Sequence, residues 1–174
     1  PPMQSIQAKG DASTRALLVT GAATGIGLAV SEMWRERNPS GKVFMLDMNQ
    51  DSLLKAVKRV GGEAYGFVVD VRDSHRVDEA LNEIGQISGS LDAVVNCAGI
   101  ALPADTAAIS DSDWESVMDI HVNGTLRICR AAHQLLRGNG AIVNLGSVAS
   151  VVGLPRRASY NAAKHAIVGL TKSL

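Results

Sequence analysis

Short apolar runs alternate with amphipathic stretches from residue 15 to the end of the chain. The runs are five or six residues long and are bounded by Gly, Asn, Asp and Ser, which is typical of buried strands. They predict strands at residues 15–20, 42–47, 64–69, 91–95 and 141–145. The stretches between them predict helices at residues 26–37, 49–60, 74–87 and 111–137, and a last helix from residue 158 onward. Ser110, with Asp113 three positions later, is the expected start of the fourth helix.

Strands that alternate with helices predict βαβ units and a parallel sheet covered by helices on both faces. Because such crossovers are right-handed, we expect a doubly wound, Rossmann-like α/β fold. One domain is expected over residues 15–174, preceded by a flexible leader at residues 1–14.

Composition and charge narrow the class of protein. Of the 174 residues, 46% are hydrophobic, and the formal net charge is zero. This is typical of a soluble globular protein, and it provides no attraction to nucleic acid or to an anionic membrane. No apolar run reaches the ~20 residues that span a bilayer, and the N-terminus lacks a signal-peptide pattern, so we expect a cytoplasmic protein. Cys97 and Cys129 are expected to be ordinary reduced thiols, and no Cys/His spacing predicts a metal site.

A glycine-rich turn, TGAATGIG at residues 20–27, follows the first expected strand and opens the first expected helix. Gly21 would allow a sharp turn, Gly25 would let backbone N–H groups approach a pyrophosphate, and Gly27 would let the helix pack closely on the strand. Thr24 and Ile26 lie in the same turn, at a helix N-terminus that favours phosphate charge. The turn predicts a dinucleotide site; a glycine-rich turn without a ligand is the alternative. A P-loop is excluded because no Gly-Lys-Ser/Thr follows.

Asp47 ends the second expected strand, twenty positions after Gly27. A carboxylate at this place can accept hydrogen bonds from the hydroxyls of an adenosine ribose, and its charge would repel a 2′-phosphate. Positions 24 and 48, which could hold a basic residue to neutralise that phosphate, are Thr24 and Met48. Asp47 therefore favours NAD over NADP, unless it only forms the turn after the strand.

Tyr160 and Lys164 are four positions apart and so share one face of the last helix. A phenol ordinarily titrates near ~10, and a neighbouring ammonium favours the phenolate form. Such a pair can give and take a proton near neutral pH, as a dehydrogenase needs at a carbinol oxygen. The spacing alone also occurs by accident on surface helices.

Further motifs accompany this pair. NCAG at residues 96–99, Asn123, Ser147 thirteen positions before Tyr160, and YNAAK at residues 160–164 stand in order behind the glycine turn. In this order and spacing the chain resembles the classical short-chain dehydrogenase/reductase family from about residue 16 to its end. The resemblance implies an oxidoreductase that transfers a hydride between NAD(H) and a secondary alcohol or ketone.

The resemblance also implies a role for each matched residue. Tyr160 is implied as the general acid/base, Lys164 as the group that favours the phenolate and binds the nicotinamide ribose, and Ser147 as a hydrogen-bond partner of the substrate oxygen. Asn123 is implied to help hold a water that links Lys164 to solvent. Further cofactor neighbours are implied near the adenine-side ribose and phosphates (Asn96, Ala98 and Gly99) and beside the adenine ring (Asp70 and Val71).

Assembly and substrate are less well defined. The resemblance implies a homodimer or homotetramer built on the helices of Asn123 and Tyr160, although their small residues also suit packing on the sheet. The apolar start of the loop at residues 148–157 predicts an apolar wall near the reacting carbon. Arg156 and Arg157 would either meet an acidic substrate or be solvated. The activity of a 3-oxoacyl reductase, a hydroxysteroid dehydrogenase or a sugar-alcohol dehydrogenase stays open.

Family members have further strands and a substrate lid beyond the part that this sequence matches. We therefore expect the chain to be part of a longer protein, with a domain that is incomplete at its C-terminal side and a fifth strand left as a bare edge. An alternative function is that of a non-catalytic dinucleotide-binding or redox-sensing protein.

Overall fold

The computed structural model describes residues 14–174, so that all of the expected leader except Thr14 lies outside the described residues. The strands are β1 (Ala16–Thr20), β2 (Lys42–Asp47), β3 (Ala64–Val68), β4 (Leu91–Asn96) and β5 (Leu136–Asn144). The helices are α1 (Gly25–Arg37), α2 (Gln50–Val60), α3 (Ser74–Ser88), α4 (Asp111–Met118), α5 (Gly124–Ala132) and α6 (Ala158–Ser173).

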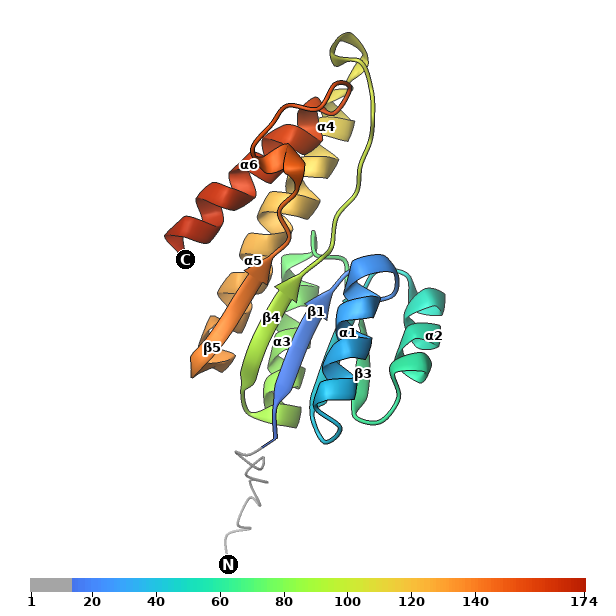
Figure 1. Ribbon diagram of the computed structural model, residues 1–174, viewed down its shortest axis with the longest axis vertical. Helices are drawn as coiled ribbons and strands as arrows, with labels where there is room; N and C mark the ends of the chain where they lie inside the picture. The colour runs from blue at the N-terminus through green and yellow to red at the C-terminus, as the bar shows by residue number, and fades with distance from the viewer. Residues whose placement is uncertain (1–13) are drawn as a thin grey trace, which may run out of the picture.

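The five strands form one parallel sheet in the order β3-β2-β1-β4-β5, which confirms the predicted doubly wound, Rossmann-like fold (Figure 1). Alternate side chains of β2 enter two different cores. Phe44 and Leu46 pack with α3 and α5, whereas Val43 and Met45 face the core that contains residues of α1 and α2. Because helices cover both faces, every residue of β1 is buried, as expected for a central parallel strand.

Polar residues fix the starts of three helices. The side chains of Asn49, Asp73 and Ser110 accept hydrogen bonds from backbone N–H groups in the first turns of α2, α3 and α4, respectively. These bonds satisfy backbone donors that have no partner within the helix. The predicted helix start at Ser110 is thereby confirmed.

The prediction of one helix over residues 111–137 is wrong in two respects. A wide π-helical turn at Asp119–Asn123 separates α4 from α5, and in it the Gly124 N–H bonds the Asp119 carbonyl five residues back. The helical segment then ends at Leu135, and β5 begins at Leu136 rather than at residue 141. Leu136 pairs with Leu91 across a register shift in β4–β5, and the glycines at positions 138 and 140 disfavour a continued helix.

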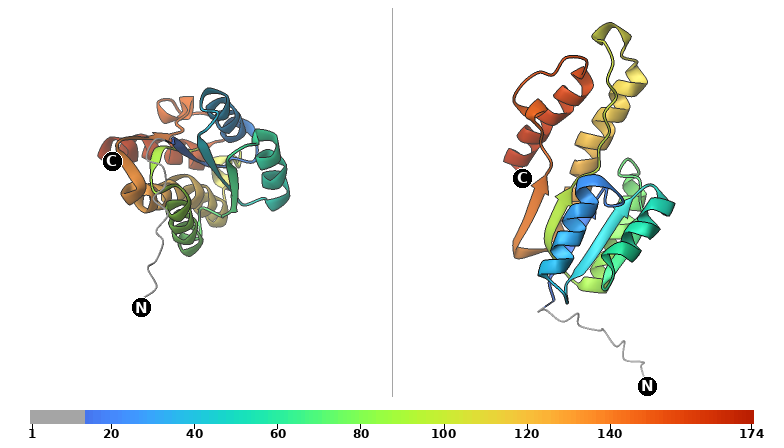
Figure 2. Two further views of the ribbon diagram at one scale, coloured as in Figure 1. Left: turned by 90° about the horizontal axis from the view of Figure 1, so that it is seen from below. Right: turned by 45° about the vertical axis from the view of Figure 1, so that its right-hand side comes forward.

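Helices α4 and α6 extend beyond the carboxyl ends of the strands (Figures 1 and 2). They pack against each other, and α6 also packs against the π-helical turn. The layer formed by α4 and α6 thus lies to one side of the carboxyl ends of β1 and β2 and does not cover them. Within residues 14–174, no helix is both long and apolar enough to cross a membrane.

Candidate active site

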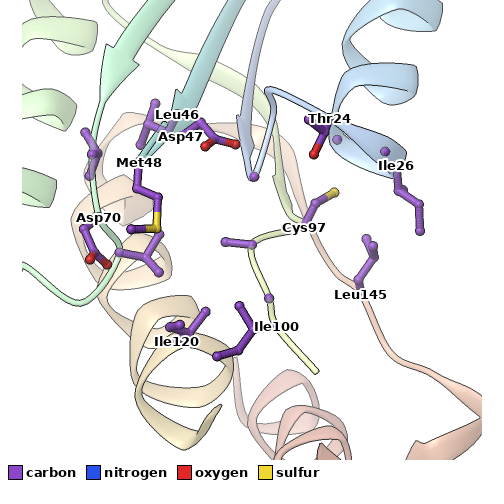
Figure 3. Close-up of a pocket in the computed structure, with 17 residues that line it drawn as sticks. Thr24, Ile26, Leu46, Asp47, Met48, Asp70, Cys97, Ile100, Ile120 and Leu145 are labelled. Atoms are coloured by element: carbon purple, nitrogen blue, oxygen red, sulfur yellow. The ribbon is translucent and has the colours of Figure 1, made fainter. Parts of the chain in front are cut away.

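A cavity of about 390 Å³ lies at the carboxyl ends of β1, β2 and β4 (Figure 3). The chain leaves β1 toward β2 on one side and later returns to β4 on the other, and open α/β sheets bind ligands at such a point. The hydroxyl oxygen of Thr20 accepts the N–H groups of Cys97 (3.1 Å) and Ala98 (3.2 Å), which ties the ends of β1 and β4 together.

The structure brings most of the expected cofactor residues into the wall of this cavity. They are Gly21, Thr24, Gly25, Ile26, Gly27, Asp47, Asp70, Val71, Ala98 and Gly99. The wall also contains residues that the sequence did not single out as cofactor neighbours: Leu46, Met48, Val69, Cys97, Ile100, Ile120 and Leu145. These are mostly apolar; Ile120 lies in the π-helical turn and the others lie at or just after strand ends. They form the sides of a slot whose polar groups lie in the glycine turn and at Asp47 and Asp70.

The glycine turn has a backbone that few other residues could adopt. Gly21 and Gly25 have φ values of 61° and 54°, in the left-handed region that favours glycine. A Cβ on Gly27 would lie 2.3 Å from the Gly21 carbonyl oxygen, whereas a Cβ on Gly25 would meet nothing within 4 Å. The turn is thus tightly packed on its inner side and open on its cavity side, at the N-terminus of α1.

Asp47 is anchored by the backbone on both sides of it. One carboxylate oxygen accepts the Ala23 N–H and the other accepts the Asn49 N–H, each at 3.0 Å. Each oxygen keeps a second lone pair, so the group can still accept hydrogen bonds from a ribose. Figure 3 places Asp47 on the wall beside Met48.

A second acidic residue, Asp70, borders the cavity near Asp47 (Figure 3). The Arg72 guanidinium donates hydrogen bonds of 2.6–3.0 Å to both carboxylate oxygens of Asp70. These bonds hold the pKa of Asp70 below its usual range. The ion pair balances the negative charge of Asp70 itself.

Tyr160 and Lys164 lie on α6, and Lys164 is directed at the end of β5. The Lys164 ammonium donates a 2.6 Å hydrogen bond to the carbonyl of Leu145, a cavity residue, and it lies 5.6 Å from the centre of the Tyr160 ring. Lys164 is only 6% exposed, and this burial lowers the pKa of its ammonium. Burial also raises the pKa of the nearby Cys97 thiol to about 11, against the opposing effect of the Lys164 charge.

Ser147 begins the short 3₁₀ turn at Val148–Ser150, which packs against α6. Its hydroxyl oxygen accepts the Ala149 N–H (3.1 Å), while the Ser150 hydroxyl accepts the Ser147 N–H (3.0 Å). These two bonds fix the position of the Ser147 oxygen and leave its hydroxyl hydrogen for another acceptor.

Ser147, Tyr160 and Lys164 lie beside the cavity and are not part of its wall, and two further expected site residues, Asn123 and Asn96, are held elsewhere. Asn123 is exposed; its amide donates to Asp119 (2.9 Å), and it lines a separate hollow beside Arg72 and Trp114. Asn96 is buried, and its amide donates to Asn144 across the ends of β4 and β5 (2.9 Å) instead of lining the cavity. The first departure follows from the π-helical turn, which the sequence pattern did not indicate.

His121 is the residue that sequence reasoning missed. It is 3% exposed, its ring meets the Tyr160 ring edge-on with 5.4 Å between ring centres, and its Nε2 lies within hydrogen-bond distance of Ile100. The available signal was helical spacing: Val117 precedes His121 by four positions and so shares its face of the helical segment, which predicts a buried imidazole.

Comparison with known proteins agrees with this geometry. A model of the short chain dehydrogenase family matches residues 15–174. The chain belongs to the short-chain dehydrogenase family. Members of this family use nicotinamide dinucleotides, for which the cavity has a suitable place and shape.

Curated relatives in this short-chain dehydrogenase family carry several names. The chain is 35% identical to D-threitol dehydrogenase of Mycolicibacterium smegmatis, covering 90% of this chain and 62% of that protein. It is 30% identical to 3-oxoacyl-[acyl-carrier-protein] reductase of Thermotoga maritima (90% and 65%). It is 36% identical to 3beta-hydroxysteroid dehydrogenase of Mediterraneibacter gnavus (91% and 58%). The chain thus spans less than two thirds of the length of these relatives.

A solved short-chain dehydrogenase structure has the same fold. It is the short-chain dehydrogenase/reductase from Brucella melitensis described as a glucose/ribitol dehydrogenase, with a TM-score of 0.87 and 27% sequence identity. The match covers 91% of this chain and 67% of that one.

Proposed function

We propose that this protein is an NAD-dependent oxidoreductase that interconverts a secondary alcohol and a ketone. The observation that carries the proposal is the joint placement of Tyr160 and Lys164 beside the cavity. The Lys164 ammonium bonds the carbonyl of the cavity residue Leu145 and lies 5.6 Å from the Tyr160 ring centre.

The residues present fit a dinucleotide. Open space at Gly25 and the positive φ of Gly21 and Gly25 suit the close approach of a pyrophosphate to the N-terminus of α1. Asp47 would accept hydrogen bonds from the adenosine ribose, and Asp70 and Val71 would border the adenine. A bound nicotinamide supplies the hydride acceptor or donor.

The proton chemistry falls to residues of this chain. In alcohol oxidation, the Tyr160 oxygen takes the carbinol proton as the carbonyl forms; in reduction, the Tyr160 hydroxyl returns that proton. Lys164 has two N–H donors besides the one that bonds Leu145, and these would bind the nicotinamide ribose. The Ser147 hydroxyl hydrogen would bond the substrate oxygen as negative charge develops there. Asn123 is left out of this group because of its position.

NAD is favoured over NADP by the charge at Asp47. Thr24 and Met48, which line the same cavity, bring no positive charge to offset it. A 2′-phosphate would therefore meet an uncompensated carboxylate.

An apolar substrate face is supported by the loop after Ser147. Val148, Val151 and Val152 are 61%, 76% and 48% exposed. Three neighbouring apolar side chains with this exposure form a surface that an apolar ligand could cover. Arg156, in contrast, pairs with Asp105 (3.0 Å). This loop therefore favours a ketone or alcohol with an apolar body over an acidic one.

Assembly and location stay predictions of the sequence. Trp114 on α4 and Leu126 on α5 are 40% and 42% exposed, which supports a homodimer or homotetramer that covers these side chains. A cytoplasmic location is proposed on the sequence grounds given above.

The proposal is tested with Tyr160→Phe in the full-length protein, assayed on a panel of secondary alcohols with NAD. We expect kcat to fall by roughly a hundredfold or more, while NADH binding measured by fluorescence stays within about twofold of the wild-type value. The ring and its contact with His121 are retained in this variant, so a loss of turnover reports on the hydroxyl. Wild-type turnover in Tyr160→Phe, or NADH binding without turnover in the wild-type protein, would favour a non-catalytic dinucleotide-binding role instead.

A further inference from the structure

His121 contacts two parts of the site at once. Its ring meets Tyr160 at an interplanar angle of 87°, with 5.4 Å between the ring centres. On its other side, Nε2 lies 3.0 Å from the Ile100 nitrogen and 2.7 Å from the Ile100 oxygen. Ile100 lines the cavity proposed to hold the cofactor. One side chain therefore connects the cofactor wall to the proposed acid/base.

The imidazole is held in this place by close packing. A Cβ on Gly99 would lie 2.3 Å from Cε1 of His121 and 3.0 Å from each ring nitrogen, so the ring lies directly against the Gly99 backbone. Nδ1 is buried and has no hydrogen-bond partner among the described residues. The ring thus has contacts that fix it on Gly99, Ile100 and Tyr160 and no polar contact that would draw it elsewhere.

The charge state of the ring suits this role. Burial lowers the pKa of His121, and the nearby Lys164 ammonium lowers it further, against the opposing effect of the bond to Ile100. A neutral ring can either accept the Ile100 N–H through Nε2 or donate from Nε2 to the Ile100 carbonyl. In both tautomers it remains bonded to the same residue.

We infer that His121 is a positioning residue that links the cofactor-facing segment Gly99–Ile100 to the Tyr160 ring. The inference rests on the proposed function, in which Tyr160 transfers a proton to a substrate held beside the nicotinamide. Through His121, the wall that contacts the cofactor and the ring that carries the hydroxyl keep a fixed separation. Misplacement of reacting groups by even about 1 Å can cost roughly a hundredfold in rate.

Two substitutions separate the two contacts of the imidazole. In His121→Gln, the amide reaches about as far as Nε2 and can bond the N–H and carbonyl of Ile100 together, but the ring contact with Tyr160 is lost. In His121→Phe, a ring remains against Tyr160, but the bonds to Ile100 are lost. His133→Gln is the matched control, because His133 is exposed on a 3₁₀ turn outside the cavity.

The experiment measures NADH affinity by fluorescence, and kcat at saturating NADH with a secondary alcohol that the wild-type, full-length protein oxidises. For His121→Gln we expect kcat to fall roughly tenfold or more, with the Kd for NADH within about twofold. For His121→Phe we expect the Kd for NADH to rise about fivefold or more, because Ile100 loses its buried partner, with a smaller loss of kcat than in His121→Gln. His133→Gln should change neither quantity.

The expected result is that His121→Gln mainly lowers kcat and His121→Phe mainly weakens NADH binding, and this difference distinguishes positioning from a purely structural role. Wild-type kcat in His121→Gln, wild-type NADH affinity in His121→Phe, or a proportional loss of both quantities in both variants would overturn the inference. If His121→Phe does not fold, the separation of kcat from NADH affinity in His121→Gln decides. If the wild-type protein binds NADH but oxidises no alcohol, the proposed function fails, and the NADH affinity of His121→Phe still tests the link to Ile100.

Discussion

The two halves of the site are held together by different kinds of contact. In the cofactor half, β1 to β4 with α1 to α3, the glycine turn is shaped by contacts between near neighbours, such as Gly27 with Gly21, and Asp47 then bonds the turn through the Ala23 N–H. In the catalytic half, residues 100–174, the two buried polar side chains each reach another segment: Lys164 bonds Leu145 nineteen positions away, and His121 bonds Ile100 twenty-one positions away.

This difference has a consequence for mutation. A change in the glycine turn should act on the packing of that turn and on cofactor binding. A change at Lys164 or His121 should act on two segments together, because each of these side chains bonds a residue of another segment. Three substitutions test the contrast, in order of decreasing expected effect.

Gly27→Ala should have the largest effect, because it disrupts the packing of the glycine turn in the cofactor half. The added Cβ would lie 2.3 Å from the Gly21 carbonyl oxygen and 3.0 Å from the Ala22 Cα, and backbone cannot move aside as a side chain can. We expect the free energy of unfolding to fall by about 3 kcal/mol and NADH affinity to fall by at least about tenfold, measured by urea unfolding and fluorescence titration. Gly169→Ala on α6 is the control, because its Cβ would meet nothing within 4 Å. Equal stability of the two variants would refute the account of the turn.

Gly99→Ala tests the contact between the two halves, because Gly99 lines the cavity and packs against the His121 ring. Its Cβ would meet Cε1 of His121 at 2.3 Å, so we expect about 2 kcal/mol lower stability by urea unfolding, from overpacking. Combined with His121→Ala, part of that loss should return as a coupling of about 1 kcal/mol. Strictly additive effects would show that the two residues do not depend on each other.

Asp47→Asn should have the smallest effect of the three, and it tests whether the charge of Asp47 sets the preference for NAD over NADP. The amide keeps the shape of the carboxylate, removes its charge and gives up one of the two backbone N–H bonds, so the preference for NADH over NADPH, as a ratio of Kd values, should fall by about tenfold. Asp51→Asn removes the same charge from an exposed position in the first turn of α2 and should leave the ratio unchanged. An unchanged ratio in Asp47→Asn would remove the argument for NAD.

The same contrast explains what the sequence could predict. Strands β1 to β4 were placed to within one residue, because each is a short apolar run next to Gly, Asn or Asp. The glycine turn and Asp47, which the sequence predicts as cofactor neighbours, lie in the cavity wall. These features depend on neighbours in the chain, and a local pattern can record them.

The errors lie in the catalytic half and in contacts between strands. The end of the fourth helix was wrong because Leu136 pairs with Leu91, a contact that no local pattern reports. The family resemblance implied that Asn123 helps hold a water that links Lys164 to solvent; in the structure its amide bonds Asp119, and the buried ring against Tyr160 is that of His121. Asn96 was expected at the cofactor, but its amide bridges β4 and β5.

The π-helical turn at Asp119–Asn123 acts as an angular offset between two helical segments. Each residue of an α-helix advances the side-chain direction by about 100°, so one extra residue in a turn rotates everything after it by that amount relative to an unbroken helix. Helix α4 can therefore face α6 while α5 faces α3 and β4. His121 lies at this offset, where the direction of the helix surface changes from one layer of the molecule to the other.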